Sequence, residues 1–124
     1  MNKNTLSIAA FVIAFLLIVG AVAYVLVPRA KYSEKSLDAF ALCLASKKIT
    51  MYGAAWCPHC QAEKARFGSS FKYIPYVECP ENEKLCIDKG VRGYPTWITE
   101  DGTKYEGEQG IEGLAKISSC PLPQ

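Results

Sequence analysis

The sequence carries little net charge of either sign, has a single histidine, and between Asn4 and Pro28 has no ionisable side chain except Tyr24. The formal net charge is +2, and after Pro28 the basic residues are interspersed with all 12 acidic ones. A nucleic-acid-binding surface needs lysine and arginine clustered without interleaved acids, so no nucleic-acid partner is expected. Half of the residues are apolar and 21% are charged, which excludes a disordered or collagen-like chain.

The longest apolar run extends from Leu6 to Val27 and is interrupted only by a serine, a glycine and a tyrosine. As a helix it is roughly 33 Å long, which is enough to cross the hydrocarbon core of a bilayer. A buried helix of a soluble protein keeps a polar stripe, and this run has none. We therefore expect residues 6–27 to lie in a membrane, within an N-terminal segment of residues 1–28.

Two fates of this segment stay open. Residues 21–23 read Ala-Val-Ala and fit a small-x-small signal-peptidase site. The apolar run continues beyond that site and is longer than the 7–15 residues usual for a signal-peptide core. This favours an uncleaved signal-anchor over a cleaved signal peptide.

The side of the membrane is indicated by the cysteines. Lys3 flanks one end of the run and Arg29, Lys31 and Lys35 flank the other, which weakly favours a cytoplasmic C-terminal domain. All six cysteines lie after the run, a density typical of an oxidising compartment. Because the charge bias is small, we expect a single-pass protein whose C-terminal domain is extracytoplasmic, in a periplasm, a lumen or the extracellular space.

Beyond a linker at residues 29–32, we expect one α/β domain over residues 33–120. Ser33 is a good N-cap for a first helix whose apolar stripe includes Leu37 and Leu44. Asp101-Gly102 between two short apolar runs is a strong hairpin signal. The expected elements after the first helix are a strand at 49–53, a helix at 57–68, a strand at 73–77, a helix at 81–89, strands at 96–100 and 103–106, and a last helix around 111–115. Their order is αβαβαββα.

The chemistry is indicated by Cys57-Pro58-His59-Cys60, which follows a predicted strand and opens a predicted helix. Two cysteines at this spacing can close into a reversible disulfide, and the helix N-terminus stabilises a thiolate at the first of them. Pro58 suits the first helical turn. A positive charge on His59 near the sulfur of Cys57 stabilises the thiolate further, which makes the disulfide form a better oxidant. We expect Cys57 to be the nucleophile and Cys60 the resolving thiol.

A zinc site is an alternative interpretation of the same cysteines. Cys79 and Cys86 lie at a suitable distance in the sequence to supply a second ligand pair. Their separation of six intervening residues fits a zinc knuckle poorly. We therefore expect no metal.

Pro95 stands at the start of a predicted strand, after Gly93 and Tyr94. This placement makes Tyr94–Pro95 a candidate cis peptide bond. The alternative is an ordinary trans proline on an edge strand.

These motifs resemble the thioredoxin superfamily, in which Trp-Cys-x-x-Cys precedes a Pro-Thr strand start by about 35 residues. More narrowly, the chain is similar over roughly residues 37–120 to the thioredoxin-like domain attached to bacterial and plant homologues of vitamin K epoxide reductase. In this chain the domain stands without the reductase's helical bundle, behind a single apolar segment. The segments that carry the similarity are 52–60 (YGAAWCPHC), 67–71 (FGSSF), 76–79 (YVEC) and 93–97 (GYPTW).

The resemblance implies a thioredoxin-like fold preceded by a single transmembrane helix, and thiol–disulfide exchange with exported cysteine-containing proteins. It implies that Pro95 lies beside the active disulfide, and that Trp56 and Tyr94 contact the substrate, with the backbone of Tyr94 pairing with the substrate strand. No cofactor is implied besides the redox-active disulfide. A membrane vitamin K epoxide reductase homologue, encoded separately, is the expected electron acceptor.

One position departs from the thioredoxin pattern. Thioredoxins carry a buried aspartate six residues before the first cysteine, where it assists proton transfer at the second cysteine, and here that position is Met51. Glu63, one turn after Cys60, is a possible substitute, although a carboxylate there is more typical of a solvated helix surface.

The four remaining cysteines allow three pairings. Cys79 and Cys86 are close enough in sequence for a local bridge, and in a thioredoxin-like fold Cys43 and Cys120 approach each other. We favour these two bridges, while a buried, unpaired Cys43 is the alternative.

Three functions compete. The first is a membrane-anchored thiol–disulfide oxidoreductase acting as an oxidase or isomerase of exported proteins. The second is a reductase of apocytochrome or copper-site thiols, and the third is a metal-binding or chaperone module.

Overall fold

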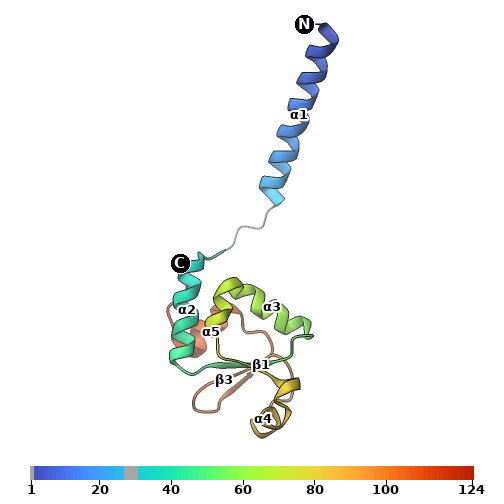
Figure 1. Cartoon of the computed structure of the whole chain (residues 1–124). Helices are drawn as coiled ribbons and strands as arrows, with labels where there is room; N and C mark the ends of the chain where they lie inside the picture. Colours follow the sequence, from blue (N-terminus) through green and yellow to red (C-terminus); the bar gives the residue numbers. More distant parts are fainter. Residues whose placement is uncertain (1, 27–30) are drawn as a thin grey trace. The chain divides into compact units, whose positions relative to one another are not determined.

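The protein forms two compact units in a computed structural model that describes residues 2–26 and 31–124. The first unit contains one long helix, and the second is an α/β domain of residues Tyr32–Gln124 (Figure 1). Of the linker expected at 29–32, residues 29 and 30 lie outside the described residues, as does Val27 at the end of the expected membrane segment.

The N-terminal unit consists of helix α1, Lys3–Leu26. Its stretch Ile8–Leu26 is long and apolar enough to cross a membrane. The side chains of this stretch are exposed within the N-terminal unit. A signal sequence near an N-terminus has the same length and composition.

The C-terminal domain is built on a four-stranded sheet in the order β2-β1-β3-β4. Strand β1 (Thr50–Gly53) pairs in parallel with β2 (Tyr76–Glu78) and antiparallel with β3 (Thr96–Ile98). Strand β4 (Lys104–Glu106) pairs antiparallel with β3. A parallel pair needs a helical crossover and an antiparallel pair needs only a short loop, which is the alternation of elements that the sequence indicates.

Helices cover both faces of this sheet (Figure 1). Helices α2 (Glu34–Ser46), α3 (Pro58–Phe67) and α5 (Gly110–Ser118) pack in one apolar core, and α4 (Glu83–Asp88) belongs to a smaller one. Successive strand residues point to opposite faces, so Met51 enters the larger core and Tyr52 the smaller one. The result is the thioredoxin-like α/β fold with the predicted order αβαβαββα.

Two predicted elements have different boundaries. The strand expected at 73–77 is only Tyr76–Glu78, because the chain after α3 continues as a 3₁₀-helix over Gly68–Tyr73. In this turn Phe71 packs edge-on against Phe67, and pairing with β1 begins with the Met51 N–H and the Pro75 carbonyl. A second 3₁₀-turn, Cys79–Glu81, delays the start of α4 to Glu83.

The predicted start of α2 and end of α3 lie where their signals placed them. Ser33 caps α2 by accepting a hydrogen bond from the Ser36 N–H at 3.2 Å. Gly68 ends α3 with φ 53°, a conformation that favours glycine. The hairpin turn contains Gly102 at φ 85°. Its two strands, Thr96–Ile98 and Lys104–Glu106, are shorter than the predicted 96–100 and 103–106, so the connecting turn is longer.

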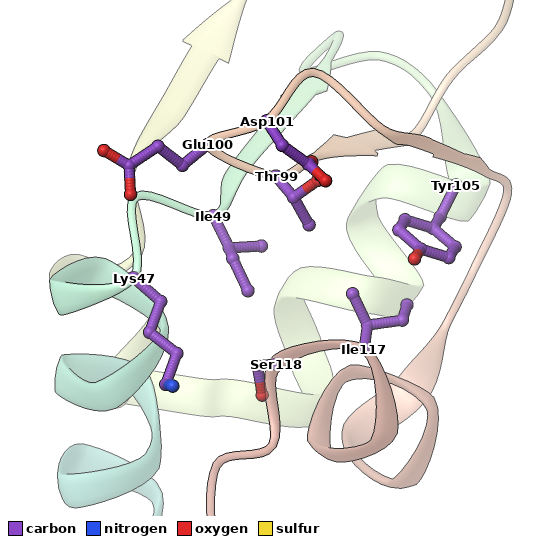
Figure 2. A pocket seen from close by; sticks show the side chains of 8 residues that line it. All are labelled: Lys47, Ile49, Thr99, Glu100, Asp101, Tyr105, Ile117 and Ser118. Carbon is purple, nitrogen blue, oxygen red and sulfur yellow. The ribbon is translucent and has the colours of Figure 1, made fainter.

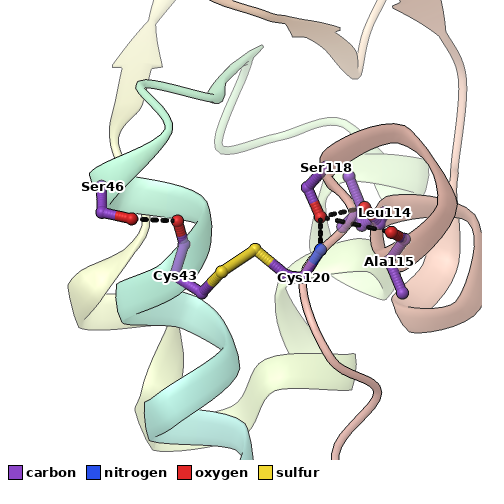
Figure 3. The surroundings of a disulfide bond; sticks show 6 residues. All are labelled: Cys43, Ser46, Leu114, Ala115, Ser118 and Cys120. Atoms are coloured by element: carbon purple, nitrogen blue, oxygen red, sulfur yellow. Dashed lines mark hydrogen bonds between the residues drawn. A yellow bond between two sulfur atoms is a disulfide. The ribbon is translucent and has the colours of Figure 1, made fainter.

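Four cysteines form the two disulfides favoured from the sequence. The Cys43–Cys120 bridge joins α2 to the chain just after α5 (Figure 3), and Cys79–Cys86 closes the segment leading into α4. Beside the first bridge, Ser118 Oγ donates to the Leu114 carbonyl at 2.6 Å and accepts from the Cys120 N–H at 3.0 Å (Figure 3). The C-terminal segment is therefore fixed to the domain both covalently and by hydrogen bonds.

Candidate redox site

Cys57 occupies the N-cap position of α3 and is a free thiol with 7% of its surface exposed. Its S–H donates to the Tyr94 carbonyl oxygen at 3.6 Å. Its own carbonyl accepts from the Gln61 N–H at 3.0 Å, which begins the helical hydrogen-bond pattern. The sulfur thus lies at the positive end of the helix dipole, where a thiolate is stabilised.

The peptide bond Tyr94–Pro95 is cis. Strand β3, which it precedes, lies between β1 and β4, so the edge-strand interpretation of Pro95 is wrong. The Pro95 carbonyl accepts from the Gly107 N–H at 2.7 Å, and Thr96 Oγ1 donates to the Gly93 carbonyl at 2.8 Å. These bonds hold the loop against the strand, with the Tyr94 carbonyl directed at Cys57.

An aromatic surface borders the thiol. Trp56 is 68% exposed, and its ring meets that of Tyr94 edge-on, with ring centroids 6.2 Å apart. An exposed tryptophan adjoining a reactive group is an apolar contact point for a substrate chain. The resemblance predicted that both residues contact the substrate, and the fold brings them together.

Cys60, the second free thiol, is fully buried one turn into α3. Burial raises the pKa of the Cys60 thiol to about 11, opposed by a hydrogen bond from the Ala54 backbone and by the charge of Lys64. A Cβ atom at Gly53 would lie 2.7 Å from Cys60 Sγ, so only glycine leaves room for the sulfur at this position. The two thiols therefore differ in position: Cys57 at the helix start and Cys60 in the core.

His59 is exposed, as expected, and the hydrogen-bond partner of its ring is Glu108. Nδ1 lies 2.7 Å from Glu108 Oε1, in the loop before α5. The other oxygen of Glu108 accepts from Arg66 at 2.7 Å. Hydrogen bonds from His59 and Arg66 lower the pKa of the Glu108 carboxyl.

Glu63 is not a solvated helix residue, and that expectation is wrong. Its carboxylate is completely buried and accepts hydrogen bonds from Trp97 Nε1 at 3.1 Å and from two backbone N–H groups at the start of α5. Arg66 Nε donates to it as well, at 3.1 Å. Four donor groups bind the Glu63 carboxylate, which thereby joins α3 to β3 and α5.

Lys64 and Tyr76 lie close to Cys60, with Glu78 bound to Tyr76, and none of the three was predicted from the sequence. Tyr76 donates its hydroxyl to Glu78, and Glu78 also accepts from the Ala55 N–H at 2.8 Å. The ammonium of Lys64 lies 3.6 Å from the centroid of the Tyr76 ring. Residues 76 and 78 alternate along β2 beside Met51 and Gly53 of β1, a placement that needs the strand register and not just the local pattern.

The zinc interpretation is wrong for the ligand set considered, because Cys79 and Cys86 are bonded to each other. Within residues 2–26 and 31–124, no group of three or more histidine, cysteine or acidic side chains is placed to hold a metal ion.

A shallow cavity of about 380 Å³ lies elsewhere in the domain, between the end of α2, the hairpin turn and the end of α5 (Figure 2). None of the predicted site residues lines it. Its side chains are Lys47, Ile49, Thr99, Glu100, Asp101, Tyr105, Ile117 and Ser118.

Comparison with known proteins gave no matching family model. The chain is 39% identical over 83 residues to thiol-disulfide oxidoreductase LTO1 of Arabidopsis thaliana, covering 60% of this chain and 22% of that protein. It is 38% identical over 82 residues to protein disulfide isomerase-like 2-2 of Oryza sativa subsp. japonica, covering 56% and 22%. The chain thus spans about a fifth of the length of these relatives.

Among solved structures, thioredoxin NaTrxh from Nicotiana alata aligns with a TM-score of 0.45 and 18% identity, over 67% of this chain and 84% of that one. The strand order and helix order described above are those of a thioredoxin-like fold, and the sequence similarity to the two plant proteins covers 56–60% of this chain.

Proposed function

We propose that this chain is a membrane-anchored thiol–disulfide oxidoreductase that exchanges disulfides with exported proteins through Cys57 and Cys60. The observation that carries the proposal is the contrast among the six cysteines. Four are paired in disulfides, while Cys57 and Cys60 are free and adjacent at a helix start, opposite a cis-proline. The names of the two plant relatives agree with this chemistry.

In the oxidising direction, the Cys57–Cys60 disulfide receives two electrons from a substrate dithiol. A substrate thiolate attacks Cys57 Sγ, the Cys57–Cys60 bond breaks, and Cys60 leaves as a thiolate. The second substrate thiol then attacks the substrate sulfur in the mixed disulfide, releasing Cys57 as a thiolate. The substrate has lost two electrons and two protons, and the protein holds both electrons as the free thiols.

Substrate recognition in this proposal uses the surface beside the thiol. The exposed Trp56 provides an apolar contact, and the Tyr94 carbonyl accepts an N–H from an extended substrate segment. Main-chain pairing of this kind is independent of substrate sequence, which suits an enzyme acting on many unfolded chains.

The anchor and the acceptor complete the proposal. Helix α1 holds the domain at the membrane, on the extracytoplasmic side, and a vitamin K epoxide reductase homologue in the same membrane removes the electrons from Cys57 and Cys60. The disulfides Cys43–Cys120 and Cys79–Cys86 support an oxidising compartment.

The test uses the full chain in detergent with reduced, unfolded pancreatic ribonuclease as the substrate. Each molecule of oxidised protein should consume two substrate thiols, counted after acid quenching and thiol trapping. Cys57→Ser should abolish the transfer, while Cys43→Ala with Cys120→Ala should leave it intact in the folded fraction. Equal thiol loss with wild type and Cys57→Ser would contradict the proposed function.

A further inference from the structure

A negative charge on Cys60 Sγ must be stabilised during exchange in either direction, and the usual group is absent. Cys60 is the leaving thiolate when a substrate attacks Cys57, and it is the attacking thiolate when a mixed disulfide on Cys57 is resolved. Water cannot solvate this charge, because Cys60 is fully buried. Met51 has no ionisable group, and Glu63 is held by its own four donor groups.

Lys64 is the cation placed to take this role. It lies four residues after Cys60 on α3, so the two side chains project from the same side of the helix. The Lys64 ammonium is 3.6 Å from the Tyr76 ring centroid and 5.3 Å from that of Phe71. Contacts with two aromatic faces hold the charge near the domain surface. Within residues 2–26 and 31–124, no carboxylate forms a direct ion pair with the Lys64 ammonium.

The ring of Tyr76 lies next to both the Lys64 ammonium and the Cys60 sulfur. A Cβ atom built on Gly53 would lie 2.7 Å from Cys60 Sγ and 3.3 Å from Cε2 of the Tyr76 ring, so the sulfur and the ring are neighbours across the glycine. The hydroxyl of Tyr76 is fixed by Glu78, which is itself bound by the Ala55 N–H at 2.8 Å. The aromatic ring that contacts the Lys64 ammonium is therefore linked, through Glu78, to the backbone just before Cys57.

We propose that Lys64, seated on the ring of Tyr76, stabilises the thiolate form of Cys60 and so accelerates the steps in which Cys60 leaves or attacks. Lys64 and Tyr76 are positioning residues in this role, because neither takes part in bond exchange. The charged and titratable groups around Cys60 are Cys57 and Lys64 on α3 and Tyr76 on β2, with Glu78 beyond Tyr76. Of these, Lys64 is the one whose charge lowers the pKa of the Cys60 thiol.

The bonds and protons balance without a further reactant. In resolution, the Cys60 S–H loses its proton to solvent, and the thiolate forms the Cys57–Cys60 bond. The bond between Cys57 and the bound thiol breaks, and the departing thiolate takes the electron pair. Lys64 keeps its proton throughout, and its contribution is electrostatic.

This inference rests on the proposed function, and the experiment separates the two. The full chain in detergent is loaded with nitrothiobenzoate as a mixed disulfide on Cys57, and attack by Cys60 releases the coloured thiolate. The release rate is measured between about pH 6 and pH 9. Lys64→Met keeps the unbranched side chain on the aromatic rings and removes the charge, while Lys64→Arg keeps the charge.

The chain offers a matched control in Lys72, whose ammonium lies 4.9 Å from the Tyr73 ring centroid. Lys72→Met removes the same charge from the same kind of contact, but Lys72 is not among the groups that act on Cys60. Thermal unfolding of each variant, followed by circular dichroism, verifies that the domain is folded.

We expect Lys64→Met to release the probe roughly threefold more slowly at every pH. A roughly tenfold smaller thiolate fraction of Cys60 is partly offset, because a more basic thiol is a better nucleophile once ionised. Lys64→Arg and Lys72→Met should match the wild type. Equal rates for Lys64→Met and wild type, or equal slowing by Lys64→Met and Lys64→Arg, would overturn the inference. If the wild type releases no more probe than Cys60→Ser, the proposed function itself fails.

Discussion

Cys57 Sγ donates a hydrogen bond to the Tyr94 carbonyl oxygen, 3.6 Å away, across a separation of 37 residues in the sequence. This contact joins the start of α3 to the cis Tyr94–Pro95 bond at the start of β3. The thiol that begins the exchange and the backbone expected to hold the substrate therefore form one surface. The second thiol, Cys60, lies in the core behind it.

The first prediction is that Cys57 reacts before Cys60 in the reduced protein. Cys57 lies at the helix N-terminus, whereas Cys60 is fully buried and its pKa is raised to about 11, mainly by burial. A brief, substoichiometric pulse of iodoacetamide at about pH 6 should label Cys57 almost exclusively, as read by peptide mass mapping. Preferential labelling of Cys60 would reverse the roles of the two thiols.

The second prediction concerns His59. An imidazolium near Cys57 stabilises the thiolate of the reduced form but not the neutral disulfide. His59 Nδ1 also lies 2.7 Å from Glu108 Oε1. His59→Ala should shift the reduction potential to more negative values by roughly 30 mV or more, equivalent to about 1.4 kcal/mol. The potential is measured by equilibration of the full chain with glutathione, with Trp56 fluorescence as the signal.

The control for this measurement is Lys84→Ala, which removes an exposed positive charge paired with Asp88 on α4. It should leave the potential unchanged. A potential for His59→Ala that is unchanged or more positive would exclude His59 from the mechanism.

The third prediction concerns the stability supplied by Glu63. Glu63→Gln replaces a carboxylate, which only accepts hydrogen bonds, with an amide whose NH₂ is itself a donor. That NH₂ would face the N–H groups that now bind Glu63, so buried N–H groups would be left without an acceptor. The free energy of unfolding should fall by about 3 kcal/mol, measured by urea titration of the full chain in detergent. Glu106→Gln, at an exposed position on β4, should change it by less than about 0.5 kcal/mol. Similar losses in both variants would refute the structural role of Glu63.

The fourth prediction compares the two disulfides. Loop-closure entropy gives the Cys43–Cys120 bridge, with a sequence separation of 77, about 4.5 kcal/mol, and the Cys79–Cys86 bridge, with a separation of 7, about 2.5 kcal/mol. Paired alanine substitutions should therefore destabilise the domain more at the first bridge than at the second. The reverse order in urea titrations would show that effects other than chain entropy dominate.

The fifth prediction places the domain on the extracytoplasmic side. A fusion of alkaline phosphatase after residue 124 should be active in a bacterial host, because the phosphatase needs an oxidising compartment for its own disulfides. A fusion at the same residue to a fluorescent protein that matures only in the cytoplasm should be dark. An inactive phosphatase with a fluorescent counterpart would reverse the orientation.

Local sequence signals determined much of this protein. The Cys57–Cys60 spacing at a strand-to-helix junction, the Ser33 cap and the Gly68 terminus depend on interactions within a few residues, so they can be predicted from neighbours in the chain. The order of elements follows from the same signals. The boundaries around Tyr73 were wrong because the aromatic packing of Phe71 on Phe67 favours a continued turn over an early strand.

The environment of Cys60 was decided only by the tertiary structure. Glu63 has the local pattern of a surface helix residue, yet it is buried because the start of α5, 46 residues away, brings backbone N–H groups that its carboxylate satisfies. Likewise, Lys64 and Tyr76 meet only after β2 pairs with β1 in the register that sets Met51 opposite Tyr76. Ion pairs and hydrogen bonds between distant segments depend on which segments become neighbours in the folded chain. The hydrophobic periodicity of a sequence predicts local helices and strands but not these neighbours.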